Sequence, residues 1–148
     1  MKIGSILENQ NIEKRVAITP EIVKKYISLG FEVCLSENYG SHLGIKDELY
    51  IEMGAKTSKD ENYILNSSNI IIQLGLLSDE QSSNILENQT IIGVLNPYKN
   101  KEKLDNLAKK KINLFSLELL PRITRAQSMD ILSSQANLAG YKAVIESF

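Results

Sequence analysis

The stretch that decides the fold is Asn69-Ile-Ile-Ile-Gln-Leu74, a short apolar run that lacks the alternation of a half-exposed strand. A strand that is apolar on both faces is typical of a parallel sheet covered by helices on both sides. Similar runs, bounded by Gly, Asn, Pro or Ser, occur before and after it. The five strands predicted in this way are Lys2–Ile6, Phe31–Leu35, Asn69–Leu74, Thr90–Leu95 and Ile112–Leu117.

Helix signals lie between these runs. Thr19 and Pro20 have the pattern of an N-cap followed by proline at the first helical position, and the apolar spacing after them ends at Gly30. This pattern predicts a helix over residues 20–29. The other predicted helices begin at the capping-box pairs Ser58-x-x-Glu61 and Ser78-x-x-Gln81 or span Asp47–Met53 and Lys101–Lys110.

The alternation of strands and helices predicts an α/β fold, doubly wound, with a mainly parallel five-stranded sheet and helices on both faces. From Thr124 to the end, the chain is free of proline and rich in Ala, Leu, Ser and Gln, which predicts one long C-terminal helix. The expected organisation is an α/β lobe over residues 1–123 and a connecting helix over residues 124–148. Because that helix has no C-cap glycine at Phe148, we expect the chain to be part of a larger protein.

Composition excludes several classes of protein. Of 148 residues, 17 are basic and 18 are acidic, so the net charge of −1 offers no electrostatic footprint for nucleic acid. One cysteine, Cys34, and one histidine, His42, cannot build a disulfide framework or a four-ligand zinc site. We expect Cys34 to lie in the core and His42 to lie in a loop. The longest apolar run is far too short to span a bilayer, so the expected setting is soluble and cytoplasmic.

Ligands of an open parallel sheet bind beyond the carboxyl ends of its strands. The polar residues expected there are Arg15, Gln73, Gly75, Asn96 and the run from Glu118 to Gln127. The last of these is the most polar, and on the predicted helix Gln127, Asp130, Ser134 and Asn137 follow at helical spacing, with Ser133 at their flank. Donors and acceptors beside a helix start suit an amide or a ribose together with a phosphate.

Two structural interpretations of the same residues stay open from the pattern alone. Thr124-x-x-Gln127 has the spacing of a capping box, in which the Gln127 side chain would be bound to a backbone N–H. Arg122 or Arg125 could pair with Asp130 in a surface ion pair. The sequence also contains no G-x-G-x-x-G, no P-loop and no G-x-S-x-G or H-E-x-x-H motif, so it carries no dinucleotide fingerprint and no hydrolase signature.

Three segments carry a resemblance to a known family. They are Lys14-Arg-Val-Ala-Ile-Thr-Pro-Glu21, Ile92-Gly-Val-Leu-Asn-Pro97 and the long block from Pro121-Arg-Ile-Thr-Arg-Ala-Gln-Ser-Met-Asp130 through Leu132-Ser-Ser-Gln-Ala-Asn-Leu-Ala-Gly-Tyr141. From Met1 to Phe148 the chain resembles the N-terminal part of the NAD(P) transhydrogenase alpha subunit, whose architecture alanine dehydrogenases share. The resemblance implies an oxidoreductase that is inactive as this chain alone.

The resemblance places four nucleotide-binding residues on this chain. Arg122 and Gln127 are expected near the nicotinamide and its ribose, and Asp130 and Ser133 are expected to orient the carboxamide. No residue is expected to act as a catalytic acid or base and none to bind a metal, because direct hydride transfer between two nicotinamides moves no proton to or from the protein.

The family also implies what lies outside this chain. The complete subunit binds NAD(H) with a second, Rossmann-type lobe that is absent here, and NADP(H) binds a partner component. The expected partners are a second copy in a homodimer, the NADP-binding component and the membrane-spanning component, with the subunit cytoplasmic and peripheral to the inner membrane. Neither nucleic-acid binding nor direct membrane insertion is expected.

Two other functions stay open. An alanine-type amino-acid dehydrogenase would use Arg15 for the substrate carboxylate, but it also needs a lysine and a histidine where the sequence reads Ile71-Ile-Gln-Leu and Val94-Leu-Asn-Pro. Without them, Arg15 is interpreted as a structural or electrostatic element of the cleft. The last alternative is a non-catalytic dimerisation or binding module, because the dinucleotide lobe is missing.

Overall fold

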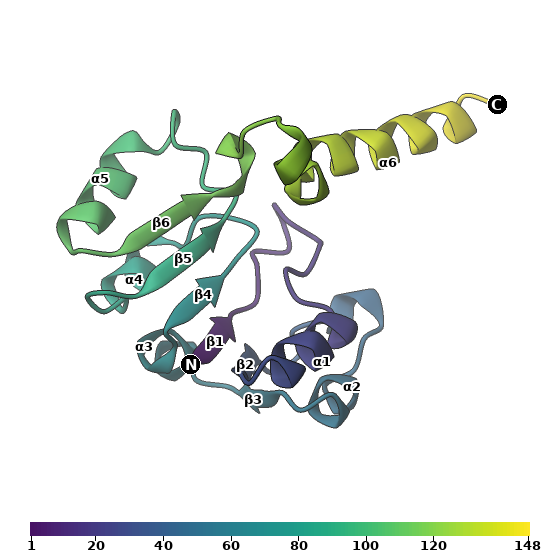
Figure 1. Cartoon of the computed structure of the whole chain (residues 1–148). Coiled ribbons are helices and arrows are strands. Elements are labelled where there is room, and N and C mark those ends of the chain that lie inside the picture. The colour runs from purple at the N-terminus through teal and green to yellow at the C-terminus, as the bar shows by residue number, and fades with distance from the viewer.

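The computed structural model describes all residues, 1–148, as one α/β lobe followed by a projecting helix (Figure 1). All strands are parallel, in the order β3-β2-β1-β4-β5-β6. The strands are β1 (Lys2–Ser5), β2 (Glu32–Ser36), β3 (Lys56–Ser58), β4 (Ile70–Ile72), β5 (Thr90–Gly93) and β6 (Asn113–Ser116). The doubly wound α/β class is therefore confirmed, and the direction of winding reverses between β1 and β4.

Helices cover both faces of the sheet, as the sequence predicted. In Figure 1, α3, α4 and α5 lie on one side of it and α1 and α2 lie on the other. The α-helices are α1 (Pro20–Ser28), α2 (Asp47–Glu52), α3 (Glu61–Ser67), α4 (Asp79–Ser83), α5 (Lys101–Lys109) and α6 (Ile131–Glu146). Short 3₁₀ turns are η1 (Ser41–Leu43), η2 (Leu117–Leu119) and η3 (Thr124–Met129). None of the helices is long and apolar enough to cross a membrane.

The core is divided into two layers by the alternation of side chains along the strands. In β2, Val33 and Leu35 point into the layer beneath α1 and α2, whereas Cys34 points into the layer beneath α3, α4 and α5. Ile71 of β4 and Ile91 of β5 belong to the same layer as Cys34. A continuous apolar strand is thus buried on both faces, which is the reason that the Asn69–Leu74 run predicted the fold.

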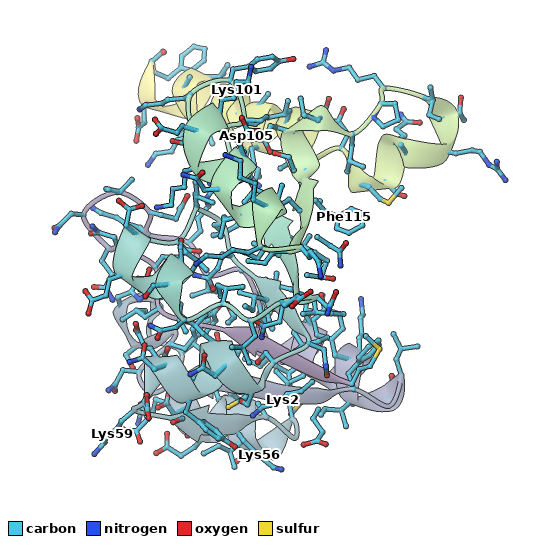
Figure 2. The ribbon with its side chains drawn as sticks, turned by 90° about the vertical axis from the view of Figure 1, so that its left-hand side faces the viewer. Lys2, Lys56, Lys59, Lys101, Asp105 and Phe115 are labelled. Carbon is cyan, nitrogen blue, oxygen red and sulfur yellow. The ribbon has the colours of Figure 1, made fainter.

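The sheet has six strands rather than the predicted five. The strand that was not predicted is β3, which reads Lys-Thr-Ser. It has no buried residue and pairs with β2 at the edge of the sheet. Its formation depends on the neighbouring strand, because its own side chains have no apolar pattern to bury. Strand β6 forms the opposite edge, where Phe115 is 58% exposed. Figure 2 shows Phe115 at this edge and Lys56 and Lys59 near the β3 edge.

Two of the predicted helix starts need correction. The Ser58-x-x-Glu61 capping box does not form, because Ser58 ends β3 and the Asp60 carboxylate caps α3 by accepting the Tyr63 backbone N–H at 3.0 Å. The predicted long helix from Thr124 is interrupted, with η3 ending at Met129 and α6 beginning at Ile131. The Ser78-x-x-Gln81 capping box is confirmed at the start of α4.

Candidate functional site

The chain leaves β6, the last strand of the sheet, and turns through η2 and η3 before α6 begins (Figure 1). A pocket of about 300 Å³ lies at this turn. Its lining residues are Arg122, Ile123, Thr124, Gln127, Asp130 and Ser133. The four residues predicted from the sequence therefore come together around one pocket, although Ser134 and Asn137, expected on the same face, do not line it.

Asp130 and Ser133 are joined by hydrogen bonds at one side of this pocket. The Asp130 carboxylate accepts the Ser133 backbone N–H at 3.0 Å and the Ser133 hydroxyl at 2.6 Å, and it caps α6. These hydrogen bonds hold the pKa of Asp130 below its ordinary value, and the Arg122 charge adds to the effect. The pocket therefore presents a fixed anionic acceptor at neutral pH, with lone pairs left for a donor from a ligand.

Arg122 and Gln127 lie on the same pocket without partners in the protein. Neither side chain has a hydrogen bond or ion pair with another residue. The capping-box interpretation of Gln127 and the ion-pair interpretation of the arginines are therefore wrong. Gln127 does not close a capping box on Thr124, because the residue at the N-cap of η3 is Ile123. Neither Arg122 nor Arg125 lies within ion-pair distance of Asp130.

The chemistry of the pocket follows from these groups. A guanidinium supplies donors only, an amide supplies both a donor and an acceptor, and an ionised carboxylate supplies acceptors only. The N-terminus of the 16-residue helix α6 adds a partial positive charge at the same place. This set fits a ligand with an amide, hydroxyl groups and a phosphate, and the unpaired Arg122 and Gln127 are the observation that supports the fit.

A second cleft, of about 610 Å³, lies at the carboxyl ends of β1, β4 and β5. Gln73, Gly75 and Asn96, which the sequence placed there, all line it, together with Glu8. The Glu8 carboxylate accepts the backbone N–H groups of Leu74 and Gly75, at 2.5 and 3.4 Å, and burial raises its pKa. Sequence reasoning missed Glu8, although its place directly after an apolar strand was the available signal.

Arg15 does not line either cleft. Its guanidinium binds the Glu13 carboxylate through Nε at 2.8 Å and Nη2 at 2.7 Å, and Nη1 donates to Gln135 Oε1 at 2.8 Å. Its ion pair with Glu13 raises the pKa of Arg15 and lowers that of Glu13. The arginine is therefore bound on three of its nitrogens by residues of this chain.

Cys34 and His42 have the structural places expected of them. Cys34 is buried in the core, and that burial raises the pKa of its thiol. His42 lies in η1, on the connection between β2 and α2, with its Nε2 2.8 Å from the Lys14 carbonyl oxygen. Neither lines the pocket formed by Arg122, Gln127, Asp130 and Ser133.

Comparison with known proteins gives a consistent picture. Residues 4–139 match the model of the family described as "Alanine dehydrogenase/PNT, N-terminal domain". The chain is 40% identical to the first part of the NAD(P) transhydrogenase subunit alpha of Rickettsia prowazekii and 38% identical to the corresponding protein of Rhodospirillum rubrum, each over 99% of the chain. It spans only 39% of the length of both relatives.

A solved structure agrees with these relatives. The chain superposes on a transhydrogenase from Sinorhizobium meliloti with a TM-score of 0.91 and 38% sequence identity. The superposition covers 99% of this chain and 43% of that one. The superposed region therefore includes nearly the whole chain, with η3 and α6 as well as the sheet.

Proposed function

Because the chain belongs to the family of alanine dehydrogenase/PNT N-terminal domains, we propose that it is the nicotinamide-end lobe of the NAD(H)-binding component of a proton-translocating NAD(P) transhydrogenase. The observation that carries the proposal is the convergence of Arg122, Gln127, Asp130 and Ser133 on one pocket. The names of the similar proteins support the enzyme class.

Each of the four side chains has a role in binding NAD(H). The unpaired Arg122 guanidinium and Gln127 amide bind the nicotinamide and its ribose. The Asp130 carboxylate accepts the carboxamide N–H, and Ser133 orients Asp130 through the two hydrogen bonds that they share. Bound NADH supplies the hydride that passes to NADP⁺ on the partner component.

The side chains of the pocket suit a reaction that depends on positioning rather than on proton transfer. The pocket is lined by no lysine, histidine or cysteine, and Asp130 has a lowered pKa that leaves it unsuited to donate a proton at neutral pH. Hydride transfer between two nicotinamides needs no proton from the protein at the reacting carbons. Orientation can supply ~7–11 kcal/mol of such a barrier, so positioning is the contribution of these residues.

The proposal extends to the assembly. A Rossmann-type lobe in the complete subunit completes the NAD(H) site, and a second copy of the subunit forms a homodimer with it. The NADP-binding and membrane-spanning components complete the enzyme, so the subunit works in the cytoplasm, peripheral to the inner membrane.

The arrangement gives less support to an alanine-type dehydrogenase. From the two stretches where that chemistry needs a lysine and a histidine, Gln73 and Asn96 line the cleft at the carboxyl ends of the strands. Arg15, which would bind the substrate carboxylate, is bound by Glu13 and Gln135 instead.

Substitutions in the complete subunit, assembled with its partner components, test the proposal. Each charge-assisted contact is worth about 1.5–3 kcal/mol, so Arg122→Ala or Asp130→Asn should weaken NADH binding or slow hydride transfer roughly ten- to hundred-fold. The measurements are NADH titration and the rate of reduction of an NADP⁺ analogue. Arg125→Ala is the matched control, because Arg125 lies in the same turn but does not line the pocket.

Three results would contradict the proposal. Unchanged kinetics in both Arg122→Ala and Asp130→Asn would show that these residues do not form the NADH site. Robust amination of pyruvate with NADH would favour the alanine-type dehydrogenase. Self-association of the complete subunit with no saturable NADH binding would favour a non-catalytic dimerisation module.

A further inference from the structure

Arg15 connects two parts of the molecule that are distant in sequence. It lies in the long connection between β1 and α1, and its Nη1 donates to Gln135, in the second turn of α6, at 2.8 Å. The two residues are 120 positions apart. This is the one side-chain hydrogen bond or ion pair that joins α6 to the rest of the chain, since the others made by α6 residues stay within α6 and its N-cap.

Glu13 holds Arg15 in the orientation that reaches α6. Its carboxylate accepts from Nε and Nη2 in the bidentate geometry that fixes the guanidinium plane, and Glu13 Oε1 also accepts the Arg15 backbone N–H at 2.9 Å. The Glu13 side chain is 22% exposed and that of Arg15 is 51% exposed. With two of its nitrogens fixed, the guanidinium has Nη1 left to donate to α6.

The bond to Gln135 lies on the opposite side of α6 from the pocket. Residues of an α-helix are about 100° apart around its axis, so Gln135 is about 200° from Ser133. Ser133 lines the pocket with Asp130, whereas Gln135 binds the loop of the lobe. Figure 1 shows α6 projecting from the lobe. Because Gln135 lies in the second turn of α6, the hydrogen bond from Arg15 holds the helix near its start.

We propose that Glu13, Arg15 and Gln135 form a positioning unit that fixes the first turns of α6 on the lobe and thereby sets the placement of Asp130 and Ser133 in the pocket. Arg15 is a positioning residue and does not contact the nucleotide. The link to catalysis rests on the proposed function, whereas the fixing of α6 stands on the contacts of this chain alone.

Amide hydrogen exchange in the 148-residue chain tests the fixing of α6. Arg15→Ala and Gln135→Met should each speed exchange at residues 133–137 roughly tenfold, and the double variant should be no faster than either. Gln135→Glu should retain wild-type exchange, because a carboxylate still accepts from Nη1. Lys142→Ala is the control, because it removes only an ion pair with Glu146 within α6. Exchange that is equal in all variants would overturn the proposal.

Kinetics of the assembled transhydrogenase test the placement of the pocket residues. Arg15→Ala and Gln135→Met should lower kcat about tenfold and change the KM for NADH less than about twofold, because orientation is lost while the contacts with the nucleotide remain. Gln135→Glu should restore kcat. Faster amide exchange with unchanged kcat would overturn the link between α6 and the pocket. If the wild-type assembly transferred no hydride, the proposed function would fail, and the exchange experiment would still decide whether α6 is fixed.

Discussion

Gln73 shows how one buried side chain organises the point at which the sheet reverses its winding. It is 3% exposed, and its Oε1 accepts from the Ser5 hydroxyl at 2.8 Å and from the Ile6 backbone N–H at 2.9 Å. Its own backbone N–H donates to Ile92. Gln73 thus joins β1, β4 and β5 at their carboxyl ends, and its neighbour across the sheet is Gly93, the last residue of β5.

Gly93 is required because the backbone of Gln73 passes directly beside it. A Cβ on Gly93 would overlap the Gln73 carbonyl oxygen. That backbone is held by the hydrogen bonds of the Gln73 N–H to Ile92 and of the Leu74 N–H to Glu8. Gly93→Ala should therefore lower the free energy of unfolding by about 1–3 kcal/mol, measured by urea denaturation.

Gly140→Ala is the matched control for that prediction. Gly140 lies inside α6 with open space where its Cβ would stand, so alanine should stabilise the helix by about 0.5–1 kcal/mol. Equal unfolding free energies for Gly93→Ala and the wild-type chain would show that the close approach to Gln73 is relaxed in solution.

Among the elements, η3 and α6 show how a cap divides a helix-forming segment. The composition from Thr124 onward favours helix throughout. At Asp130, however, the backbone ψ is 89°, which is not helical, and the side chain accepts from the Ser133 backbone N–H. Aspartate competes for nearby backbone N–H groups, and this competition favours a new helix start over the interior of a longer helix. The break turns Asp130 and Ser133 toward Arg122 and Gln127.

The cap of α6 should depend on pH. Because the folded pKa of Asp130 is lowered from the ordinary 3.8, its stabilising effect is fully present above that value and is lost as the pH falls through the lower folded pKa. The ¹³Cα secondary shifts of residues 131–135 should therefore decrease in helical character between about pH 5 and pH 2. In Asp130→Asn they should stay constant, because asparagine caps helices without titrating. A pH response of the same size in that variant would assign the change to another carboxyl group.

In the whole molecule, α6 stands apart from the lobe that carries the core. No residue of α6 is buried, and its apolar side chains are exposed on several sides of the helix. The two core layers lie between the sheet and the helices α1 to α5. The buried core of the lobe therefore contains no residue of α6.

Removal of α6 should leave the lobe folded. A chain ending at Asp130 should unfold in urea with a free energy within about 0.5 kcal/mol of the full chain, because the truncation mainly removes an exposed hydrogen bond from Arg15. A decrease of more than about 1 kcal/mol would show that α6 contributes packing to the lobe. The full-length chain provides the reference measured under the same conditions.

The sequence by itself determined what depends on neighbours along the chain. The apolar run at Asn69–Leu74, the capping box at Ser78 and the proline at the start of α1 predicted the parallel α/β fold, because burial on two faces and helix caps leave local patterns. The grouping of Arg122, Gln127, Asp130 and Ser133 around one pocket is also local, because the four residues lie within 12 positions.

Only the tertiary structure decided what depends on distant partners. Strand β3 forms because β2 offers an edge, Glu8 is buried because the backbone of Leu74 and Gly75 donates to it, and Arg15 is bound by a residue 120 positions away. None of these contacts leaves a periodic or capping pattern in its own segment. They arise when the sheet assembles, because assembly brings together backbone groups and charges that the chain keeps far apart in sequence.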